Sequence, residues 1–191
     1  SGRKSVRFTI SRSSGRQTHR PTRPCPEESR KLKLTIAAIG RMKAGPMADL
    51  VDTYAKRTRQ AGRQAGITAL NVVDFPESRK TTAPARAAEE AALLENAAPQ
   101  GAALVVLDER GKPVSTTEFA AIIKTELESG TQDLVFAVGG PDGHAAALRK
   151  TARHVVSFGH MTWPHMLARV LLAEQIYRVV TILVNHPYHR D

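Results

Sequence analysis

The sequence contains a single cysteine, Cys25, among its 191 residues, and that scarcity excludes several kinds of site. One thiol cannot form an internal disulfide framework or a thiolate zinc cluster, so a reducing compartment is expected, most simply the cytoplasm. No run approaches the roughly 18 apolar residues that a membrane-spanning helix needs, and no secretory signal peptide is recognisable. The chain is expected to be a soluble cytoplasmic protein, with enough residues for one globular domain.

Several catalytic motifs are missing as well. The sequence has no GxGxxG or GxxxxGK[ST] pattern, which argues against a dinucleotide-binding fingerprint or a P-loop. It has no GxSxG motif, and its only thiol lies in a basic N-terminal segment. Covalent catalysis by serine or cysteine is therefore not expected.

Basic residues are concentrated at the N-terminus. Residues 1–31 contain nine Lys or Arg against Glu27 and Glu28, a net charge of +7, which leaves +3 of the total +10 for residues 32–191. This Ser/Thr/Pro-rich segment lacks hydrophobic periodicity and is predicted to be disordered. Three interpretations stay open: an arm that binds RNA phosphates, a transit-like presequence, or residues that precede the true start of translation.

From Leu32 onward, short apolar runs alternate with helical patterns. Runs rich in Val, Ile and Leu are typical of buried strands, and apolar residues at helical spacing indicate helices between them. The expected strands are residues 33–40, 67–75, 102–112, 133–140 and 154–159, and the expected helices are residues 47–63, 85–98, 116–128, 145–151 and 163–184. This alternation predicts an α/β domain with a largely parallel sheet covered on both faces. For the helix 116–128, Thr116 and Thr117 before Glu118 indicate a Ser/Thr cap.

The last expected helix, residues 163–184, is apolar on nearly every face. Such a helix needs cover on more than one side, which a domain of this size is not expected to supply alone. The helix is therefore predicted to form part of a homodimer interface. Glu174 and Arg178 have the favourable i,i+4 order and are expected to pair.

Ligands of open α/β sheets bind beyond the carboxyl ends of the strands, which here means the loops after Leu107, Val138 and Ser157. The segment GGPDGH (residues 139–144) could cradle an anion or a polar ligand end with its backbone amides, but it is equally typical of an ordinary turn. The segment LDERGK (residues 107–112) fits either a solvated turn or a ligand-facing loop.

Four of the seven histidines lie in the last 32 residues: His160, His165, His186 and His189. A zinc site is one interpretation, but only two residues separate the last two histidines, and no HExxH motif or cysteine partner accompanies them. Hydrogen bonding or acid/base catalysis is favoured, because the unperturbed pKa of histidine lies nearest neutral pH.

Four segments in order resemble one family: GGPDG, SFGHMTWPH, RVLLAEQIYR and the terminal NHPYHRD. Over residues 32–191 the chain resembles the RlmH family of SPOUT-class methyltransferases, which methylate N3 of a pseudouridine in 23S ribosomal RNA. The resemblance implies an α/β knot fold with a C-terminal trefoil knot, S-adenosylmethionine bound at the knot, and a homodimer that acts on the assembled ribosome. Residues 1–31 fall outside the family pattern.

The resemblance also implies roles for residues. The cofactor contacts would be Leu107, Gly139, Gly140, Phe158, Gly159, His160, Met161, Thr162 and Trp163. The catalytic roles are hypotheses that rest on residue chemistry and on a terminus that adjoins the cofactor loop. His189 would remove or position the proton, Arg190 would hold a phosphate or a base carbonyl oxygen, and Tyr188 would place the terminus or stack on the base.

RNA contacts are expected from Arg169, Arg178 and His186, with the two arginines alternatively at the dimer interface. The terminus is expected close to Gly139 or to the loop 158–163, within one chain or across the dimer. No metal is expected, because methyl transfer from a sulfonium is an in-line displacement that depends on positioning. Two other functions stay open: a nonenzymatic RNA- or ribosome-binding module, and a SPOUT methyltransferase that acts on another RNA.

Overall fold

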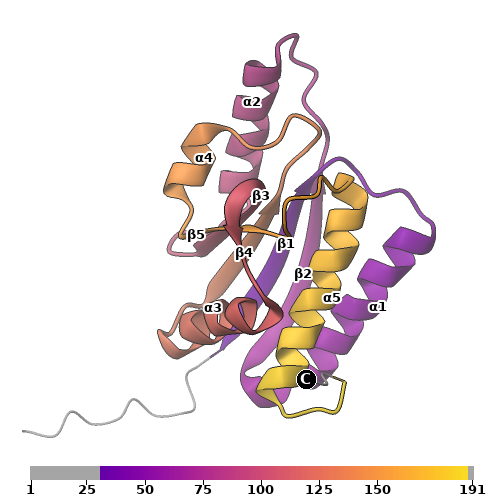
Figure 1. The fold of residues 1–191 in the computed structure, drawn as a ribbon, viewed down its shortest axis with the longest axis vertical. Helices are drawn as coiled ribbons and strands as arrows, with labels where there is room; N and C mark the ends of the chain where they lie inside the picture. The colour runs from indigo at the N-terminus through magenta and orange to yellow at the C-terminus, as the bar shows by residue number, and fades with distance from the viewer. Residues whose placement is uncertain (1–30, 189–191) are drawn as a thin grey trace, which may run out of the picture.

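A five-stranded parallel sheet between two layers of helices forms the protein, shown by a computed structural model that describes residues 31–188 (Figure 1). The segment 1–30 and the last three residues lie outside the described part. No helix within residues 31–188 is both long and apolar enough to cross a membrane. The strands are β1 (Leu32–Ile39), β2 (Ile67–Phe75), β3 (Ala103–Pro113), β4 (Asp133–Val138) and β5 (His154–Ser157). The helices are α1 (Pro46–Gly62), α2 (Ala83–Asn96), α3 (Thr116–Glu128), α4 (Ala146–Thr151) and α5 (His165–Leu183), and the 3-10 turn η2 (Arg63–Ala65) precedes β2.

Every expected strand and helix is present, with ends that differ by at most two residues from the expected ones. The strand order is β2-β1-β4-β3-β5, which the sequence pattern did not predict. All four strand pairs are parallel, so the carboxyl ends of the five strands meet at one edge of the sheet.

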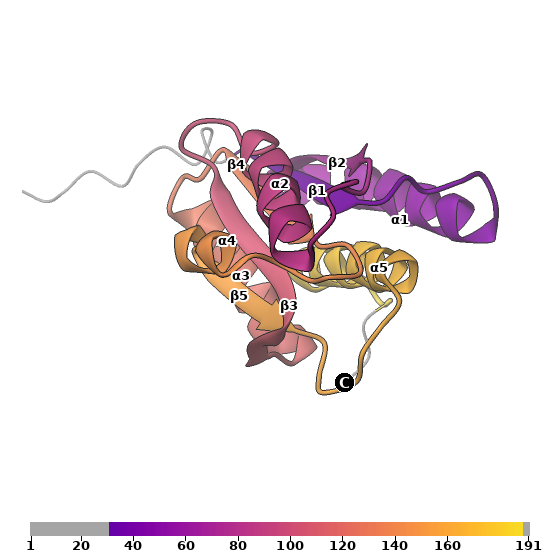
Figure 2. The same cartoon turned by 90° about the horizontal axis from the view of Figure 1, so that it is seen from above.

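The side chains of β1 alternate between two hydrophobic cores. Leu34, Ile36 and Ala38 pack with residues of α1, α3 and α5, whereas Ala37 and Ile39 pack with residues of α2 and α4. Figure 2 shows the corresponding layers, with α1 and α5 together and α2 and α4 across the sheet. The uninterrupted apolar sequence of β1 is explained by this burial on both faces.

Helix α5 receives more cover from its own chain than its sequence suggested. It packs against α1 and α3, and Leu172, Ala173 and Ile176 are completely or almost completely buried. The large apolar side chains that stay exposed lie at its beginning and just before it, at Met161, Trp163 and Leu167. The premise that one domain cannot cover this helix is therefore wrong for most of its length, and a dimer has to be argued from the exposed residues.

Strand β3 makes a bulge where it passes β5. Val156 pairs with Leu107 before the bulge and with Lys112 after it, so residues 108–111 arch out of the ladder. This arch carries the LDERGK segment to the carboxyl edge of the sheet. The trefoil knot stays a prediction.

Candidate functional site

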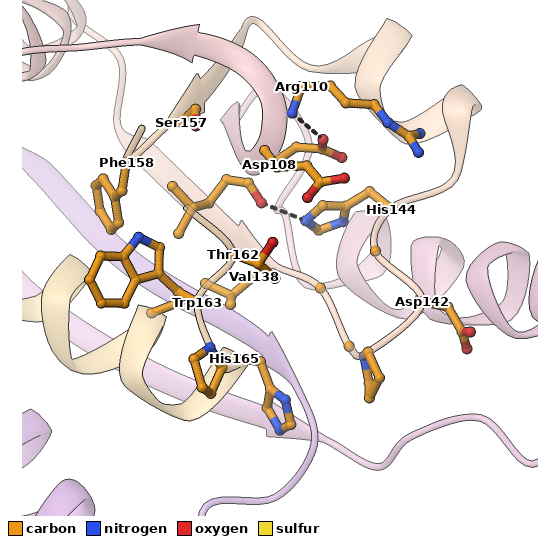
Figure 3. A pocket seen from close by; sticks show the side chains of 18 of the residues that line it. Asp108, Arg110, Val138, Asp142, His144, Ser157, Phe158, Thr162, Trp163 and His165 are labelled. Carbon is orange, nitrogen blue, oxygen red and sulfur yellow. Dashed lines mark hydrogen bonds between the residues drawn. The ribbon is translucent and has the colours of Figure 1, made fainter. Parts of the chain in front are cut away.

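An open cavity of about 540 Å³ lies at the carboxyl edge of the sheet (Figure 3). Volumes of this order are usual for sites that bind small molecules and cofactors. The cavity is formed by the bulge of β3 that begins at Leu107, by the loops after β4 and β5 and by the beginning of α5. The bulge and the two loops follow Leu107, Val138 and Ser157, the three positions that the sequence indicated. The predicted cofactor residues that line it are Leu107, Gly139, Gly140, Phe158, Gly159, Met161, Thr162 and Trp163. His160 is not among the residues that line the cavity.

The loop after β4 lies close to its neighbours at its first two glycines, where an added side chain would press on them. A Cβ atom on Gly139 would stand 3.1 Å from the ring of His144, and one on Gly140 would stand 3.0 Å from Cγ2 of Ile39 and 3.1 Å from Oε2 of Glu90. The glycines therefore let this loop lie close against Ile39, Glu90 and His144. They leave its backbone free to face the cavity.

His144 fastens the loop after β4 to β3 at the residue where the bulge of β3 begins. Its Nε2 lies 3.1 Å from the carbonyl oxygen of Leu107, to which the Nε2–H tautomer donates a hydrogen bond. The side chain is buried, and burial lowers its pKa. His144 is therefore a neutral hydrogen-bond donor that shapes the site. The sequence had placed it within GGPDGH without giving it a role.

Asp108 and Arg149 form a second connection between the loops of the cavity. Arg149 Nη1 lies 3.1 Å from Asp108 Oδ2 and also donates to the carbonyl oxygen of His144. The backbone N–H of Arg110 donates to Asp108 Oδ1 at 2.8 Å. Because only 6% of the Asp108 side chain is exposed, a solvated turn does not describe this residue. The sequence gave no signal for Arg149, which pairs with Asp108 only once the sheet has formed.

The loop after β5 turns sharply at Gly159. Ser157 Oγ donates to the carbonyl oxygen of Gly159 at 2.7 Å and accepts from its N–H at 3.2 Å. Gly159 has a φ of +105°, which residues with a side chain rarely adopt. This turn directs Met161, Thr162 and Trp163 along one side of the cavity.

The C-terminal residues lie at the other end of α5. Tyr188 Oη donates to Glu174 Oε1 at 3.2 Å, and its ring centroid lies 4.8 Å from that of Tyr177. Tyr177 follows His165 at the cavity by twelve residues, or about 18 Å of helix. The expectation that Tyr188 approaches the cavity of its own chain is therefore wrong. An approach across a dimer stays a prediction, and His189 and Arg190 lie outside the described residues.

The surroundings of Tyr188 also involve Arg178, whose Nη2 lies 2.6 Å from Glu174 Oε1. This pair confirms the expected i,i+4 contact. The guanidinium carbon of Arg178 lies 5.0 Å from the centre of the Tyr188 ring. Burial of the phenol, the largest cause, raises the pKa of Tyr188 to about 12. His186 is exposed, and its backbone N–H donates to the carbonyl oxygen of Thr181.

Arg169 does not fit its predicted contact with RNA. Its side chain is completely buried, with Nη1 3.0 Å from Asp74 Oδ1. Its Nη2 donates to the carbonyl oxygens of Ile39 and Gly40 at the end of β1. Arg169 therefore fastens α5 to the ends of β1 and β2 inside the fold, where RNA has no access to it.

No group of three or more His, Cys, Asp or Glu side chains within residues 31–188 is arranged to hold a metal ion. The cavity instead combines an apolar wall, with Leu107, Val138, Phe158 and Trp163, and a polar wall with Asp108 and Arg149. Such a site suits an organic ligand that has an aromatic part and a charged part.

Comparison with known proteins connects this site to a family. A family described as "Predicted SPOUT methyltransferase" matches residues 32–189. The chain belongs to the SPOUT methyltransferase family.

Three relatives from Brucella carry the name "Ribosomal RNA large subunit methyltransferase H". The proteins of Brucella anthropi, Brucella ovis and Brucella abortus are 48%, 45% and 45% identical to this SPOUT chain. Each match covers 84% of this chain and 100% of the relative. As a methyltransferase the chain needs a methyl donor, and its cavity has the size and lining to bind one.

Proposed function

We propose that the chain uses S-adenosylmethionine to methylate N3 of a pseudouridine in 23S ribosomal RNA, with the assembled ribosome as substrate. The observation that carries the proposal is the match of 45–48% identity to proteins named ribosomal RNA large subunit methyltransferase H over their whole length. A ribosomal substrate agrees with the cytoplasmic location expected from the composition.

The described cavity fits S-adenosylmethionine in size and chemistry. Leu107, Phe158 and Trp163 would offer apolar contacts to the adenine. The loop after β4 that contains Gly139 and Gly140, here called the glycine loop, would offer backbone groups to the polar atoms of the ligand. His160, which does not line the cavity, is left out of the proposed cofactor site. When bound, S-adenosylmethionine supplies a methyl group activated by the sulfonium.

The protein's chemical task is to position the acceptor and to move one proton. The imide N3 of pseudouridine carries a proton at neutral pH and would have to lose it to attack the methyl group that the bound donor would supply, with the thioether of the donor as leaving group. His189 is proposed to accept the N3 proton, and Arg190 to hold a phosphate or the carbonyl oxygen on which negative charge develops. Tyr188, whose pKa is raised to about 12, stays protonated and is proposed to place the terminus rather than to act as the base.

A homodimer would bring this terminus to a cavity. Met161, Trp163 and Leu167 are exposed beside the cavity, and Met47 and Leu50 are exposed at the beginning of the neighbouring α1. An antiparallel contact between two copies of α5 would cover these apolar side chains. It would also place the terminal residues of one protomer beside the cavity of its partner. Arg178 and His186, which lie at the C-terminal end of α5, are proposed to contact RNA.

Mass spectrometry of ribosomal RNA from cells with and without the gene tests the substrate. We expect one methylated pseudouridine of 23S RNA to disappear with the gene, whereas loss of a methyl group from another RNA would contradict the proposed substrate. Calorimetric titration of the purified protein with S-adenosylmethionine tests the enzyme class, since a binding module without catalytic function would take up none.

Removal of residues 189–191 tests the terminus. We expect methylation to be abolished while calorimetric S-adenosylmethionine binding and the dimer mass in solution are retained. Full activity of the truncated protein would contradict the role of His189 and Arg190.

A further inference from the structure

Two neighbouring loops beside the cavity carry exposed basic side chains. The loop 40–45 after β1 contains Arg41 and Lys43, and the loop 76–82 after β2 contains Arg79 and Lys80. The loops begin side by side, because Ile39 pairs with Phe75 and the N–H of Gly40 donates to the carbonyl oxygen of Phe75 at 2.8 Å. We refer to these two segments as the basic loops.

The four cations of the basic loops form no ion pair with another residue of the described part, residues 31–188. Three of the nearby carboxylates are already engaged. Asp74 pairs with Arg169, Asp142 pairs with Arg86, and Glu89 accepts a hydrogen bond from Ser78 Oγ. Glu77, in the loop 76–82 itself, is also exposed, and its Oε1 lies 4.0 Å from Nε2 of His165. The basic loops therefore present more positive than negative charge to the solvent.

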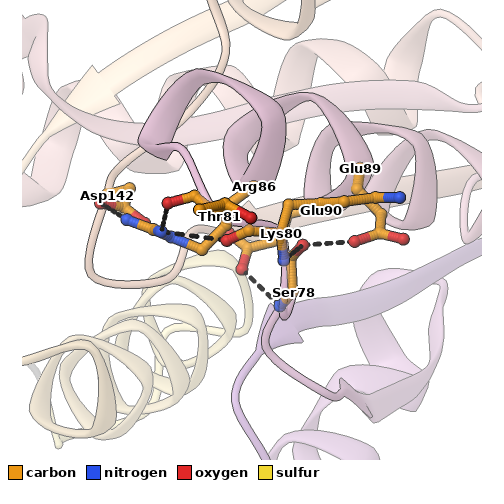
Figure 4. A network of polar contacts seen from close by, with 7 residues as sticks. All are labelled: Ser78, Lys80, Thr81, Arg86, Glu89, Glu90 and Asp142. Atoms are coloured by element: carbon orange, nitrogen blue, oxygen red, sulfur yellow. Dashed lines mark hydrogen bonds and ion pairs between the residues drawn. The ribbon is translucent and has the colours of Figure 1, made fainter.

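Arg86 of α2 connects one basic loop to the cavity (Figure 4). Its Nε and Nη2 donate to the carboxylate of Asp142 at 2.6 and 3.0 Å, in the loop after β4 that lines the cavity. Its Nη1 donates to the carbonyl oxygens of Lys80 and Thr81 at 3.1 and 3.2 Å. One guanidinium thus joins α2, the loop 76–82 and the loop that lines the cavity.

A second contact of α2 fixes the beginning of the same basic loop. The N–H of Ser78 donates to Glu90 Oε1 at 2.9 Å, and the other carboxylate oxygen of Glu90 faces Gly140. Both ends of the segment 78–81 are therefore held by a helix that also touches the glycine loop. Arg86 does more than form an ordinary surface ion pair. Its three guanidinium nitrogens donate to the carboxylate of Asp142 and to two backbone carbonyl oxygens, and these acceptors lie in two different loops.

We propose that the basic loops bind phosphate groups of the RNA substrate and that Arg86 is a positioning residue that sets the loop 76–82 relative to the methyl-donor cavity. Lysine and arginine contacts to phosphates supply affinity and fix the register of a nucleic acid without reading its sequence. The inference rests on the proposed function only in taking RNA as the substrate. Beyond the proposed function, it identifies the basic loops as the surface that aligns the acceptor nucleotide with the cavity.

The first test removes charge from one basic loop. We expect Arg79→Ala/Lys80→Ala to raise the KM for ribosomes by on the order of tenfold or more and to reduce the dependence of log affinity on log salt by about one unit per lost phosphate contact. The KM for S-adenosylmethionine should stay that of the wild type. The matched control is Lys124→Ala/Lys150→Ala, which removes the same charge from exposed residues of α3 and α4, helices that lead back to the amino ends of the strands. Equal losses in both double variants would reduce the effect to net charge and overturn the proposal.

The second test separates positioning from charge. We expect Arg86→Lys, which keeps the charge but cannot form the same fork, to raise the KM for both ribosomes and S-adenosylmethionine, because the two loops are no longer aligned. Asp142→Asn, which keeps one oxygen as an acceptor for Arg86, should raise both KM values by less than Arg86→Lys does. Thermal unfolding of each variant checks that the fold is retained, and wild-type KM values for a folded Arg86→Lys protein would overturn the positioning role.

The experiments distinguish a failure of this inference from a failure of the proposed function. If the wild-type protein does not bind S-adenosylmethionine or does not methylate ribosomes, the proposed function fails. If the wild type methylates ribosomes and Arg79→Ala/Lys80→Ala does so with the same KM and salt dependence, only the RNA surface fails.

Discussion

Gly111 lies against the backbone of Val156, so closely that a Cβ atom on Gly111 would stand 2.6 Å from the carbonyl carbon of Val156. The same atom would stand 2.8 Å from the carbonyl carbon of Val155. Both neighbours are main-chain atoms of β5, which cannot rotate away as a side chain could. The arch 108–111 can therefore cross β5 only without a side chain at this position, and the arch brings Asp108 to the cavity.

Gly111→Ala should destabilise the protein by more than about 3 kcal/mol, because the added methyl group forces two strands apart. The control is Gly101→Ala, where no atom lies within 4 Å and only the φ of +83° is unfavourable. That substitution should cost about 1–2 kcal/mol. Urea unfolding of the two variants measures the difference, and equal midpoints would show that the crossing is less close than described.

The sequence predicted the strands and helices well because each carries its own periodicity, but it could not predict how β3 and β5 cross. The Gly111 contact joins segments more than forty residues apart, and the glycine in LDERGK looks like any turn residue. The strand order could not be predicted for the same reason, because it depends on which strands pair along their edges, and these strands are far apart in the sequence.

Arg169→Met should lower the free energy of unfolding by about 3–5 kcal/mol, because it leaves the Asp74 carboxylate and two carbonyl oxygens without their buried partner. Urea unfolding at neutral pH measures the loss. Arg169→Lys should restore little of it, since a single ammonium cannot reach acceptors that the planar guanidinium spans. A folded Arg169→Met protein with unchanged stability and impaired RNA binding would instead support the RNA contact that the sequence suggested.

The site could be predicted in part, for a physical reason. The glycine loop and the loop after β5 follow strands directly, so the parallel sheet alone brings them to one edge. Arg169 was misassigned because a charged residue is usually exposed, and only the structure shows the acceptors at the ends of β1 and β2 that hold it inside. Arg149 and Arg86 likewise have partners that no local pattern indicates.

Ser115→Ala should destabilise the protein by about 1 kcal/mol, because Ser115 caps α3. Its Oγ accepts from the N–H of Glu118 at 3.1 Å, and its own N–H donates to Glu118 Oε2 at 2.8 Å. The sequence had indicated Thr116 and Thr117 as capping residues, so Thr117→Ala, with no change expected in the unfolding midpoint, is the control. A larger effect at Thr117 would favour the cap that the sequence suggested.

The same cap makes stability depend on acid. The hydrogen bond from the Ser115 backbone, with a contribution from Lys112, lowers the pKa of Glu118 from 4.5 to about 2. The stabilisation that the ionised Glu118 carboxylate contributes is therefore complete above pH 4.5 and is lost as the pH falls through about 2. Thermal unfolding between these pH values should show a smaller decline for Glu118→Gln than for the wild type, and parallel curves would contradict the assignment.

Glu90→Gln should stabilise the protein at neutral pH. Burial, the largest cause, raises the pKa of the Glu90 carboxyl, because its Oε2 is buried without a hydrogen-bond partner among the described residues. Ionised Glu90 therefore disfavours the folded state above its raised pKa, and this penalty disappears as the pH falls toward the ordinary value of 4.5.

The glutamine keeps an oxygen for the N–H of Ser78, and an unpaired amide costs less than an unpaired charge. We expect the melting temperature of Glu90→Gln to exceed that of the wild type at pH 8, with the difference shrinking as the pH approaches 4.5. Glu89→Gln, one residue earlier and exposed, should show no such pH-dependent gain. If Glu90→Gln instead melts lower than the wild type at pH 8, the Glu90 carboxylate has a partner in solution, and Gly140 in the cavity loop is the first place to look for it.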